Sequence, residues 1–223
     1  APMARSPFDP AFSELPRTLP IFPLSGVLLL PGGRLPLNVF EPRYLAMTRA
    51  ALTGPRLIGM IQPRDADQPG PQPEVQRVGC AGRIVSFAET DDGRYLITLA
   101  GLCRFLALGE LPLDQGFRRV VADWTPYAAD LEPVSASVDR TRLIGALRAF
   151  FADQPVRIDW KAIEETADDR LIVSLAMLCP FEAAEKQILL EAASPSERAR
   201  VMIALLESAA LSRGEGDGPQ VRH

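Results

Sequence analysis

The few lysines and the single histidine limit the chemistry that this chain can perform. Lys161 and Lys186 are the only lysines among 223 residues, and His223, the last residue, is the only histidine. A serine–lysine dyad would need one of these ammonium groups beside a serine such as Ser174, and a histidine triad would need the terminal imidazole to fold back. Ser174 lies among apolar residues at helical spacing, which indicates an ordinary helix-face serine. We therefore expect no catalytic residues.

Metal, disulfide and nucleotide sites also lack their usual ligands. Cys80, Cys103 and Cys179 are far apart and have no Cys-x-x-Cys spacing, which favours reduced thiols in a cytoplasmic protein. No glycine is followed by the lysine of a phosphate-binding loop. The acidic pairs 164–165 and 168–169 lie near predicted helix starts, where carboxylates favour the helix dipole; a metal or acid–base role is the weaker alternative. We expect no metal and no cofactor.

Polar and aromatic side chains gather around one predicted strand and the helix after it. From 34 to 40 the residues alternate, with Leu35, Leu37 and Val39 on one face. Pro36 lacks a backbone donor, which places this strand at a sheet edge. An edge strand can accept an extended peptide as a further strand. The candidate binding residues are Arg34, Asn38, Phe40, Glu41, Arg43, Tyr44 and, further along the chain, Arg104.

For Glu41 and Arg43, a purely structural role is favoured over a binding role. Glu41 would then cap the following helix, while Arg43 would pair with an acidic group and fix the strand-to-helix corner. The same alternative applies to Arg104. On a later helix, Lys186, Gln187 and Glu191 are expected to form a solvated face.

The elements that must position these residues are short strands as far as residue 126. Prolines and glycines interrupt the first apolar stretch, so it cannot be one helix. Pro42 begins a helix that should end near Leu52, before Gly54 and Pro55. The other predicted strands are 56–61, a bent or bulged strand at 75–87, a strand from Tyr95 to Leu99 after a turn at 91–93, a continuation from Gly101 to Leu108, and 117–124.

After Tyr127 the apolar period changes to that of helices. Four helices are expected, and Ser194 caps the last of them with Pro195 at its first position. Their predicted buried faces carry, in order, Leu143, Ile144, Leu147, Phe150 and Phe151; Leu171, Ile172, Leu175 and Leu178; Phe181, Ala184, Ile188 and Leu189; and Val201, Met202, Leu205, Leu206 and Ala209.

The predicted fold class is therefore α+β, with a β-rich domain followed by a helical bundle. Four segments are expected: an arm at 1–16 that docks through Phe8 and Phe12, a β-rich domain at 17–126, a helical domain at 127–211 and a disordered tail at 212–223. The net charge of −4 argues against general nucleic-acid binding. No apolar run reaches the ~20 residues of a membrane span, and the start has no secretory pattern, so a cytoplasmic location without membrane contact is expected.

Several motifs of this chain resemble one known family. In the first half these are Pro20-Ile21-Phe22-Pro23-Leu24, Leu30-Pro31-Gly32 and the run from Leu35 to Tyr44; in the second half they are Asp92-Gly93-Arg94, Leu99 to Phe105, Pro180-Phe181, Glu185 to Glu191 and Glu197-Arg198. Over about residues 18–208 the chain resembles the LON substrate-binding domain, the amino-terminal domain of the Lon protease, which also occurs in stand-alone bacterial proteins. The resemblance implies that the β part is PUA-like.

The resemblance also implies a function, namely recognition of unfolded or exposed protein segments or docking to a partner such as a protease. The parts of Lon that hydrolyse ATP and cut peptides have no counterpart in the sequence, so we expect a non-catalytic module. Three alternatives stay open: an RNA binder, because PUA-like folds often bind RNA; a peptidase, a label that transfer from whole Lon would produce; and a scaffold that dimerises through its helices. The sequence does not predict the oligomeric state.

Overall fold

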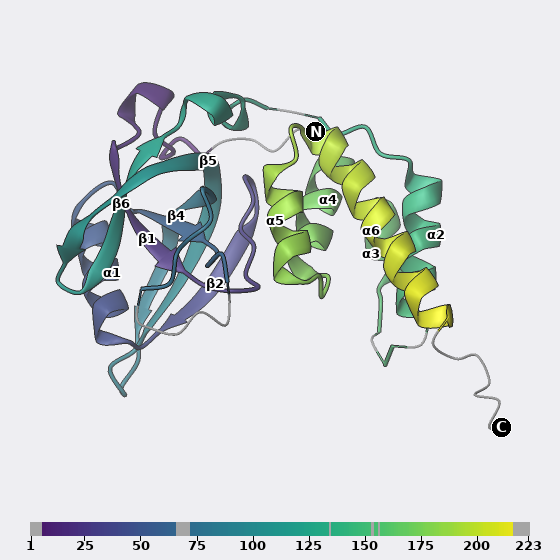
Figure 1. Cartoon of the computed structure of the whole chain (residues 1–223), viewed down its shortest axis with the longest axis horizontal. Helices are drawn as coiled ribbons and strands as arrows, with labels where there is room; N and C mark the ends of the chain where they lie inside the picture. The colour runs from purple at the N-terminus through teal and green to yellow at the C-terminus, as the bar shows by residue number, and fades with distance from the viewer. Residues whose placement is uncertain (1–5, 66–71, 134, 153, 156, 216–223) are drawn as a thin grey trace.

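A strand-rich part and a helical part lie side by side in this protein (Figure 1). A computed structural model describes residues 6–65, 72–133, 135–152, 154–155 and 157–215. The strands are β1 (Thr18–Pro23), β2 (Arg34–Val39), β3 (Leu57–Ile61), β4 (Val78–Glu89), β5 (Tyr95–Asp114) and β6 (Phe117–Asp123). The helices are α1 (Pro42–Thr53), α2 (Arg140–Phe151), α3 (Trp160–Glu165), α4 (Asp168–Leu178), α5 (Ala183–Glu191) and α6 (Pro195–Glu215), with 3₁₀ segments η1 (Phe12–Glu14) and η2 (Thr125–Leu131).

Five of the strands close into a ring and leave β2 at an edge. The sheet order is β2-β5-β4-β3-β1-β6, and β5 pairs in addition with β6. Among the strand pairs of the described residues, only β1 and β3 run parallel. The edge position predicted for the strand that contains Pro36 is confirmed, because β2 pairs with β5 alone among the strands that the structure describes.

The ring closes because β5 is long enough to pair with three strands, β2, β4 and β6. Its first half pairs with β2 and β4, and its second half pairs with β6. We predicted a strand from Tyr95 to Leu99 and a continuation from Gly101 to Leu108, and the structure joins both in one strand that reaches Asp114. Gly101 does not end the strand but lets the preceding loop approach, since a Cβ at this position would lie 2.0 Å from the carbonyl oxygen of Leu30.

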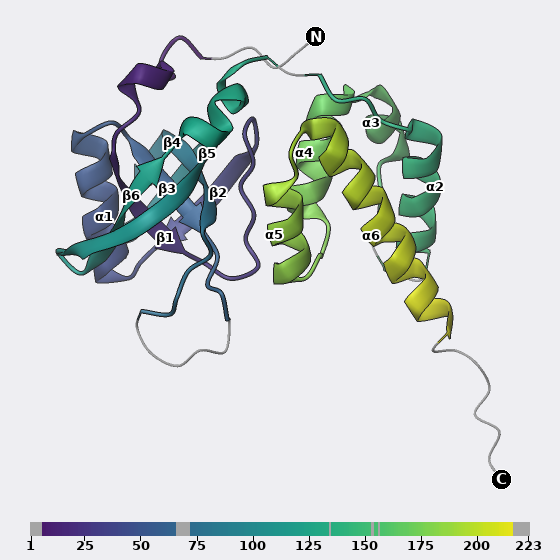
Figure 2. The ribbon, with the colours of Figure 1, turned by 45° about the horizontal axis from the view of Figure 1, so that its top comes forward.

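Helix α1 covers the outside of the ring on the side away from the helical part (Figures 1 and 2). It buries Tyr44, Met47 and Ala51, and the ring of Tyr44 stacks on that of Phe22 at a centroid distance of 4.0 Å. The predicted start at Pro42 is confirmed, and the helix ends at Thr53, directly before Gly54. A second apolar cluster fills the ring itself; its members include Leu19, Ile21, Leu57, Phe105, Val120 and Trp124.

The helical part contains five helices among the described residues, one more than we predicted. The additional helix, α3, has six residues, and its apolar residues Trp160 and Ile163 are only partly buried, so the pattern is too short to predict a helix. Helix α6 extends past Leu211 to Glu215, into the predicted tail, and the Ser212 hydroxyl still donates to the Ser208 carbonyl at 3.0 Å. Residues 216–223 of that tail lie outside the described residues.

Three apolar residues that we placed on buried helix faces are exposed, namely Leu178, Ala184 and Ile188. Leu178, the last residue of α4, is 81% exposed, and Ile188 of α5 is 53% exposed. Leu178 lies at the border with the strand-rich part, and α5 buries Gln187, Leu189 and Leu190 instead of Ile188. Helical periodicity locates a stripe but does not identify which of its edges meets a neighbour.

The arm before β1 is held by polar contacts, not by its aromatic rings. Phe8 and Phe12 are exposed, which overturns the predicted docking through them. Instead the carboxylate of Asp9 accepts a hydrogen bond from Arg83 Nε at 2.8 Å, and the indole of Trp124 donates to the Pro16 carbonyl at 2.9 Å. The arm is therefore held by two hydrogen-bond acceptors, the Pro16 carbonyl and the Asp9 carboxylate, whereas the two phenylalanine rings remain in solvent.

Candidate functional site

The border between the two parts is closed along α5 by a buried arginine. Arg104 of β5 is 5% exposed. Its Nε and Nη2 donate to the two carboxylate oxygens of Asp130, each at 2.8 Å. Its Nη1 donates to the carbonyl oxygens of Leu190 at 3.0 Å and Ala192 at 2.7 Å, at the end of α5. Arg104 therefore joins the sheet, η2 and α5.

The electrostatics of Arg104 suit a permanent link. Burial alone would lower the pKa of its guanidinium, but the hydrogen bonds and charge of Asp130 outweigh burial and raise it. The guanidinium carbon also lies 4.5 Å from the centre of the Tyr127 ring. All three of its nitrogen atoms donate to protein acceptors, so this geometry supports the structural alternative for Arg104.

Two side chains of α5 that we predicted to be solvated are also held at this border. Lys186 Nζ donates to the Gly26 carbonyl at 2.7 Å. Gln187 is buried, accepts from Gln62 Nε2 at 3.1 Å and donates to the Val78 carbonyl at 3.2 Å. The prediction failed because this face of α5 meets the loops that follow β1 and β3. We call this set of contacts the seam: Gln62, Arg104, Asp130, Lys186 and Gln187.

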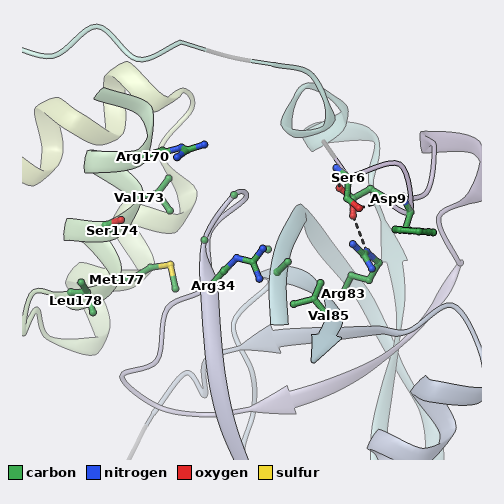
Figure 3. A pocket seen from close by; sticks show the side chains of 15 residues that line it. Ser6, Asp9, Arg34, Arg83, Val85, Arg170, Val173, Ser174, Met177 and Leu178 are labelled. Carbon is green, nitrogen blue, oxygen red and sulfur yellow. Dashed lines mark hydrogen bonds and ion pairs between the residues drawn. The ribbon is translucent and has the colours of Figure 1, made fainter. Parts of the chain in front are cut away.

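Beside the seam, the same border opens into a cleft of about 860 Å³ (Figure 3). One wall is α4, and the other is formed by the start of β2 with neighbouring residues of β4 and β5. The two walls touch at one point, because a Cβ on Gly33 would lie 2.3 Å from the sulfur of Met177. The lining of this space, which we call the cleft, includes Gly33, Arg34, Arg83, Arg170, Ser174 and Met177.

Three arginines line the cleft, and two of them have no polar partner among the described residues. Arg83 of β4 is bound to Asp9, as described above. Arg34 of β2 and Arg170 of α4 are exposed, and neither makes a hydrogen bond or ion pair with the residues that the structure describes. Figure 3 shows Arg170 on α4 and Arg34 on the facing strand. Sequence analysis found Arg34 but missed Arg83 and Arg170, which carry no local motif.

A smaller pocket of about 260 Å³ adjoins the cleft and shares Asp9, Gly32, Gly101 and Val173 with it. Arg198 lines this pocket, and burial lowers the pKa of its guanidinium to about 10, helped by the charge of Arg104. The two spaces together give the border a continuous concave surface on the α4 side.

The free edge of β2 begins at the cleft. Gly101 N donates to the Gly33 carbonyl at 2.8 Å, so the paired register makes Leu35, Leu37 and Val39 the residues whose peptide groups face β5. The peptide groups of the alternate residues, Arg34, Pro36 and Asn38, therefore point to the unpaired side. Pro36 is tolerated because its nitrogen, which has no hydrogen, faces that side.

The other predicted site residues lie at the far end of β2, outside the cleft. Phe40 is 61% exposed, with the Arg94 guanidinium 5.9 Å from its ring centre. Glu41 precedes α1, but its carboxylate does not cap the helix; it accepts from Arg43 Nε at 3.0 Å. The Arg43 guanidinium lies 4.7 Å from the ring centre of Tyr44, and burial raises the pKa of Tyr44 although Arg43 partly lowers it. A binding role at this corner stays a prediction.

The described residues do not assemble a hydrolytic or metal centre. Ser174 is exposed at the cleft, while Lys161 Nζ lies 3.7 Å from a Glu165 carboxylate oxygen and Lys186 Nζ is used in the seam. The described part of the chain holds no group of three or more His, Cys, Asp or Glu side chains that would suit a metal ion. Nor does any helix in that part have the length and apolar character needed to cross a membrane.

Solved structures show which class of fold this arrangement of sheet and helices belongs to. The Lon N-terminal domain protein from Xanthomonas campestris superimposes with a TM-score of 0.60 and 24% identity, over 84% of this chain and 97% of that one. The N-terminal domain of the Lon protease from the Mycobacterium avium complex gives a TM-score of 0.59 and 17% identity, over 85% and 97%. The chain therefore has the fold of a Lon N-terminal domain.

Sequence comparison assigns the family. The family model for the ATP-dependent protease La (LON) substrate-binding domain matches residues 18–208, and the chain belongs to this family. It is 25% identical to a Lon protease of Anaeromyxobacter dehalogenans and 24% identical to Lon protease 2 of Myxococcus xanthus, in each case over 86% of this chain. It spans only 23% and 24% of the length of these two relatives. The predicted resemblance and its limits, residues 18–208, are confirmed.

Proposed function

We propose that this protein is a non-catalytic module that binds unfolded or exposed protein segments at the cleft and along the free edge of β2. The observation that carries the proposal is that an unpaired strand edge starts inside an open cleft between two structural parts. Family membership supports it, since the matched domain is named for substrate binding. Docking to a protease and a cytoplasmic location stay predictions, as does the PUA-like character of the ring.

The edge of β2 offers a defined set of backbone partners. The N–H groups of Arg34 and Asn38 and the carbonyl groups of Arg34, Pro36 and Asn38 point to the unpaired side. The side chains of all three residues are exposed, so solvent reaches this edge. An extended segment would accept hydrogen bonds from two N–H groups and donate to carbonyl groups, which is β-augmentation with one donor missing at Pro36.

The apolar lining of the cleft supplies affinity that does not depend on a particular sequence. In the wall formed by α4, Met177 is partly exposed and Val173 is buried beside the cleft. Leu178, at the end of α4, leaves most of its side chain in solvent. Backbone pairing combined with apolar contact suits a partner that exposes main chain and hydrophobic side chains together. Unfolded protein has both features.

The proposal is tested by placing a proline at a residue of β2 whose N–H group points to the unpaired side of the strand. Asn38→Pro removes the edge donor at residue 38 without touching the ladder to β5, and Asn38→Ala retains the donor as the matched control. Binding of a labelled, permanently unfolded protein should weaken at least about tenfold in Asn38→Pro, on the order of the loss of one hydrogen bond and its register. It should be unchanged in Asn38→Ala.

Circular dichroism and the urea midpoint of each variant establish that both are folded. Deletion of the whole segment 34–44 would not serve, because it removes Val39 and Tyr44 from the core. Equal affinity of folded Asn38→Pro and wild-type protein would contradict the proposal. So would casein digestion by the purified chain that is lost in Ser174→Ala.

A further inference from the structure

The charge of the cleft is opposite to that of the whole chain. Its charged lining residues are Arg34, Arg83, Arg170 and Asp9, three positive and one negative, whereas the chain carries a formal net charge of −4. Arg34 and Arg170 stand on opposite walls, and neither has a polar partner among the described residues (Figure 3). Arg34 lies on the strand whose free edge begins at the cleft, and Arg170 lies on the facing helix.

The arm of the protein already shows how a carboxylate is bound here. Asp9 Oδ1 lies 2.8 Å from Arg83 Nε, and both side chains are largely buried by the contact. The other oxygen of Asp9 accepts from the backbone N–H of Ser6 at 2.9 Å. The neighbouring Phe8 is exposed at the cleft. A single aspartate with an apolar neighbour is thus accommodated on one of the three arginines.

We propose that the cleft selects acidic protein segments, in which Asp or Glu side chains pair with Arg34 and Arg170 while the backbone pairs with β2. The inference rests on the proposed function and specifies its substrate class. Arginine suits this task because its planar guanidinium can bind both oxygens of a carboxylate and remains charged at all physiological pH values. Asp9 occupies the third arginine in the absence of a partner.

The phosphates of a nucleic acid would also pair with arginines, but the site favours a peptide. The cleft combines its arginines with Val173, Met177 and Leu178, and its lining offers a single aromatic ring, Phe8, where binding of a nucleic-acid strand would use several rings for successive bases. The negative charge of the rest of the chain would repel a long polyanion, whereas a short acidic segment meets only the local field.

The test compares two labelled peptides that differ only in charge, using fluorescence anisotropy with the full chain at low salt. One alternates aspartate with valine and threonine, and the other has asparagine at each aspartate. The acidic peptide should bind about three- to tenfold more tightly, as expected for two partly solvated ion pairs, and the difference should shrink in high salt. A single-stranded RNA oligonucleotide should not compete.

Charge reversal identifies the arginines responsible. Arg34→Glu and Arg170→Glu should each remove most of the preference, and the double variant should prefer the asparagine peptide. The matched control is Arg49→Glu, an exposed arginine on α1 on the far side of the ring (Figures 1 and 2), which makes the same charge change and should keep the preference.

The outcomes separate this inference from the proposed function. If both peptides bind equally and charge reversal has no effect, while Asn38→Pro still abolishes binding, acidic selection is wrong and the binding module stands. If neither peptide binds, both are wrong. If RNA displaces the acidic peptide, or if Arg49→Glu acts like Arg34→Glu, the preference is a general charge effect and the inference is overturned.

Discussion

The seam and the cleft are two stretches of the same border, and their polar side chains differ in burial and in hydrogen bonding. In the seam, Arg104 and Gln187 are buried and their polar atoms are bonded to protein partners. In the cleft, Arg34 and Arg170 remain exposed and unbonded among the described residues. Buried and satisfied groups hold two parts together, whereas solvated and unsatisfied groups are available to a partner. Changes in the seam should therefore affect stability, and changes in the cleft should affect binding.

The largest effect should follow removal of Arg104. Arg104→Ala removes the side-chain donors of the carbonyl groups of Leu190 and Ala192 and leaves Asp130 only the backbone N–H of residue 104, which should lower the free energy of unfolding by about 3 to 5 kcal/mol. Urea denaturation measures it. Arg142→Ala breaks an exposed arginine–carboxylate pair, with Glu207, and should shift the midpoint far less. Similar shifts of the urea midpoint in the two variants would contradict the greater contribution to stability that we assign to the buried seam.

A pH-dependent loss should come from Cys179, which ends α4 next to exposed Leu178. Burial raises the pKa of the Cys179 thiol from 9.0 to about 11, although the Lys186 charge partly lowers it. Between these values the unfolded chain releases the proton and the folded chain retains it, so stability present below pH 9 falls as the pH rises to 11. The loss is about 2 to 3 kcal/mol. Between pH 8.5 and 11 the urea midpoint of Cys179→Ala should decline less steeply than that of the wild-type protein. Equal slopes in the two proteins would disprove the role of Cys179.

A smaller effect should follow replacement of Gln187, the amide of the seam. Gln187→Leu retains the volume but leaves the Val78 carbonyl without this donor, at a cost of about 1 to 3 kcal/mol in the free energy of unfolding. Ile188→Ala, its exposed neighbour on α5, should change stability by less than about 0.5 kcal/mol and is the control in the same urea titration. If the two variants are equally stable, Gln187 does not hold the border.

The smallest change in stability should come from the cleft. Arg170→Glu alters an exposed side chain without a described partner, so the free energy of unfolding should stay within about 0.5 kcal/mol of the wild-type value. The same variant should nevertheless change peptide preference. A large destabilisation would show that Arg170 supports the fold and would remove it from the binding surface.

The sequence identified a candidate residue on only one wall of the cleft, the wall formed by β2. Alternation around Pro36 placed β2 at an edge and made Arg34 a candidate, because strand geometry is a local property with a period of two. Arg170 and Arg83 escaped notice because their proximity to Arg34 depends on how a helical part docks on a sheet. No local pattern encodes that docking.

The seam was missed for the same reason. The bond from Arg104 to Leu190 joins residues 86 positions apart, and that from Gln62 to Gln187 joins residues 125 apart. Polar residues such as Lys186 and Gln187 normally lie on solvated faces, and only the tertiary contacts with Gly26 and Val78 reverse this expectation. Element types near Pro42 and Ser194 were predicted well because caps and prolines act within one turn.

Amide hydrogen exchange along β2, followed by NMR with and without a saturating extended peptide, tests the central claim most directly. Binding at the free edge predicts that the N–H groups of Arg34 and Asn38 exchange at least about tenfold more slowly in the complex, because they gain acceptors. The N–H groups of Leu35 and Leu37, already within the ladder to β5, should change little. A peptide that binds while Arg34 and Asn38 exchange at their original rates would contradict the account.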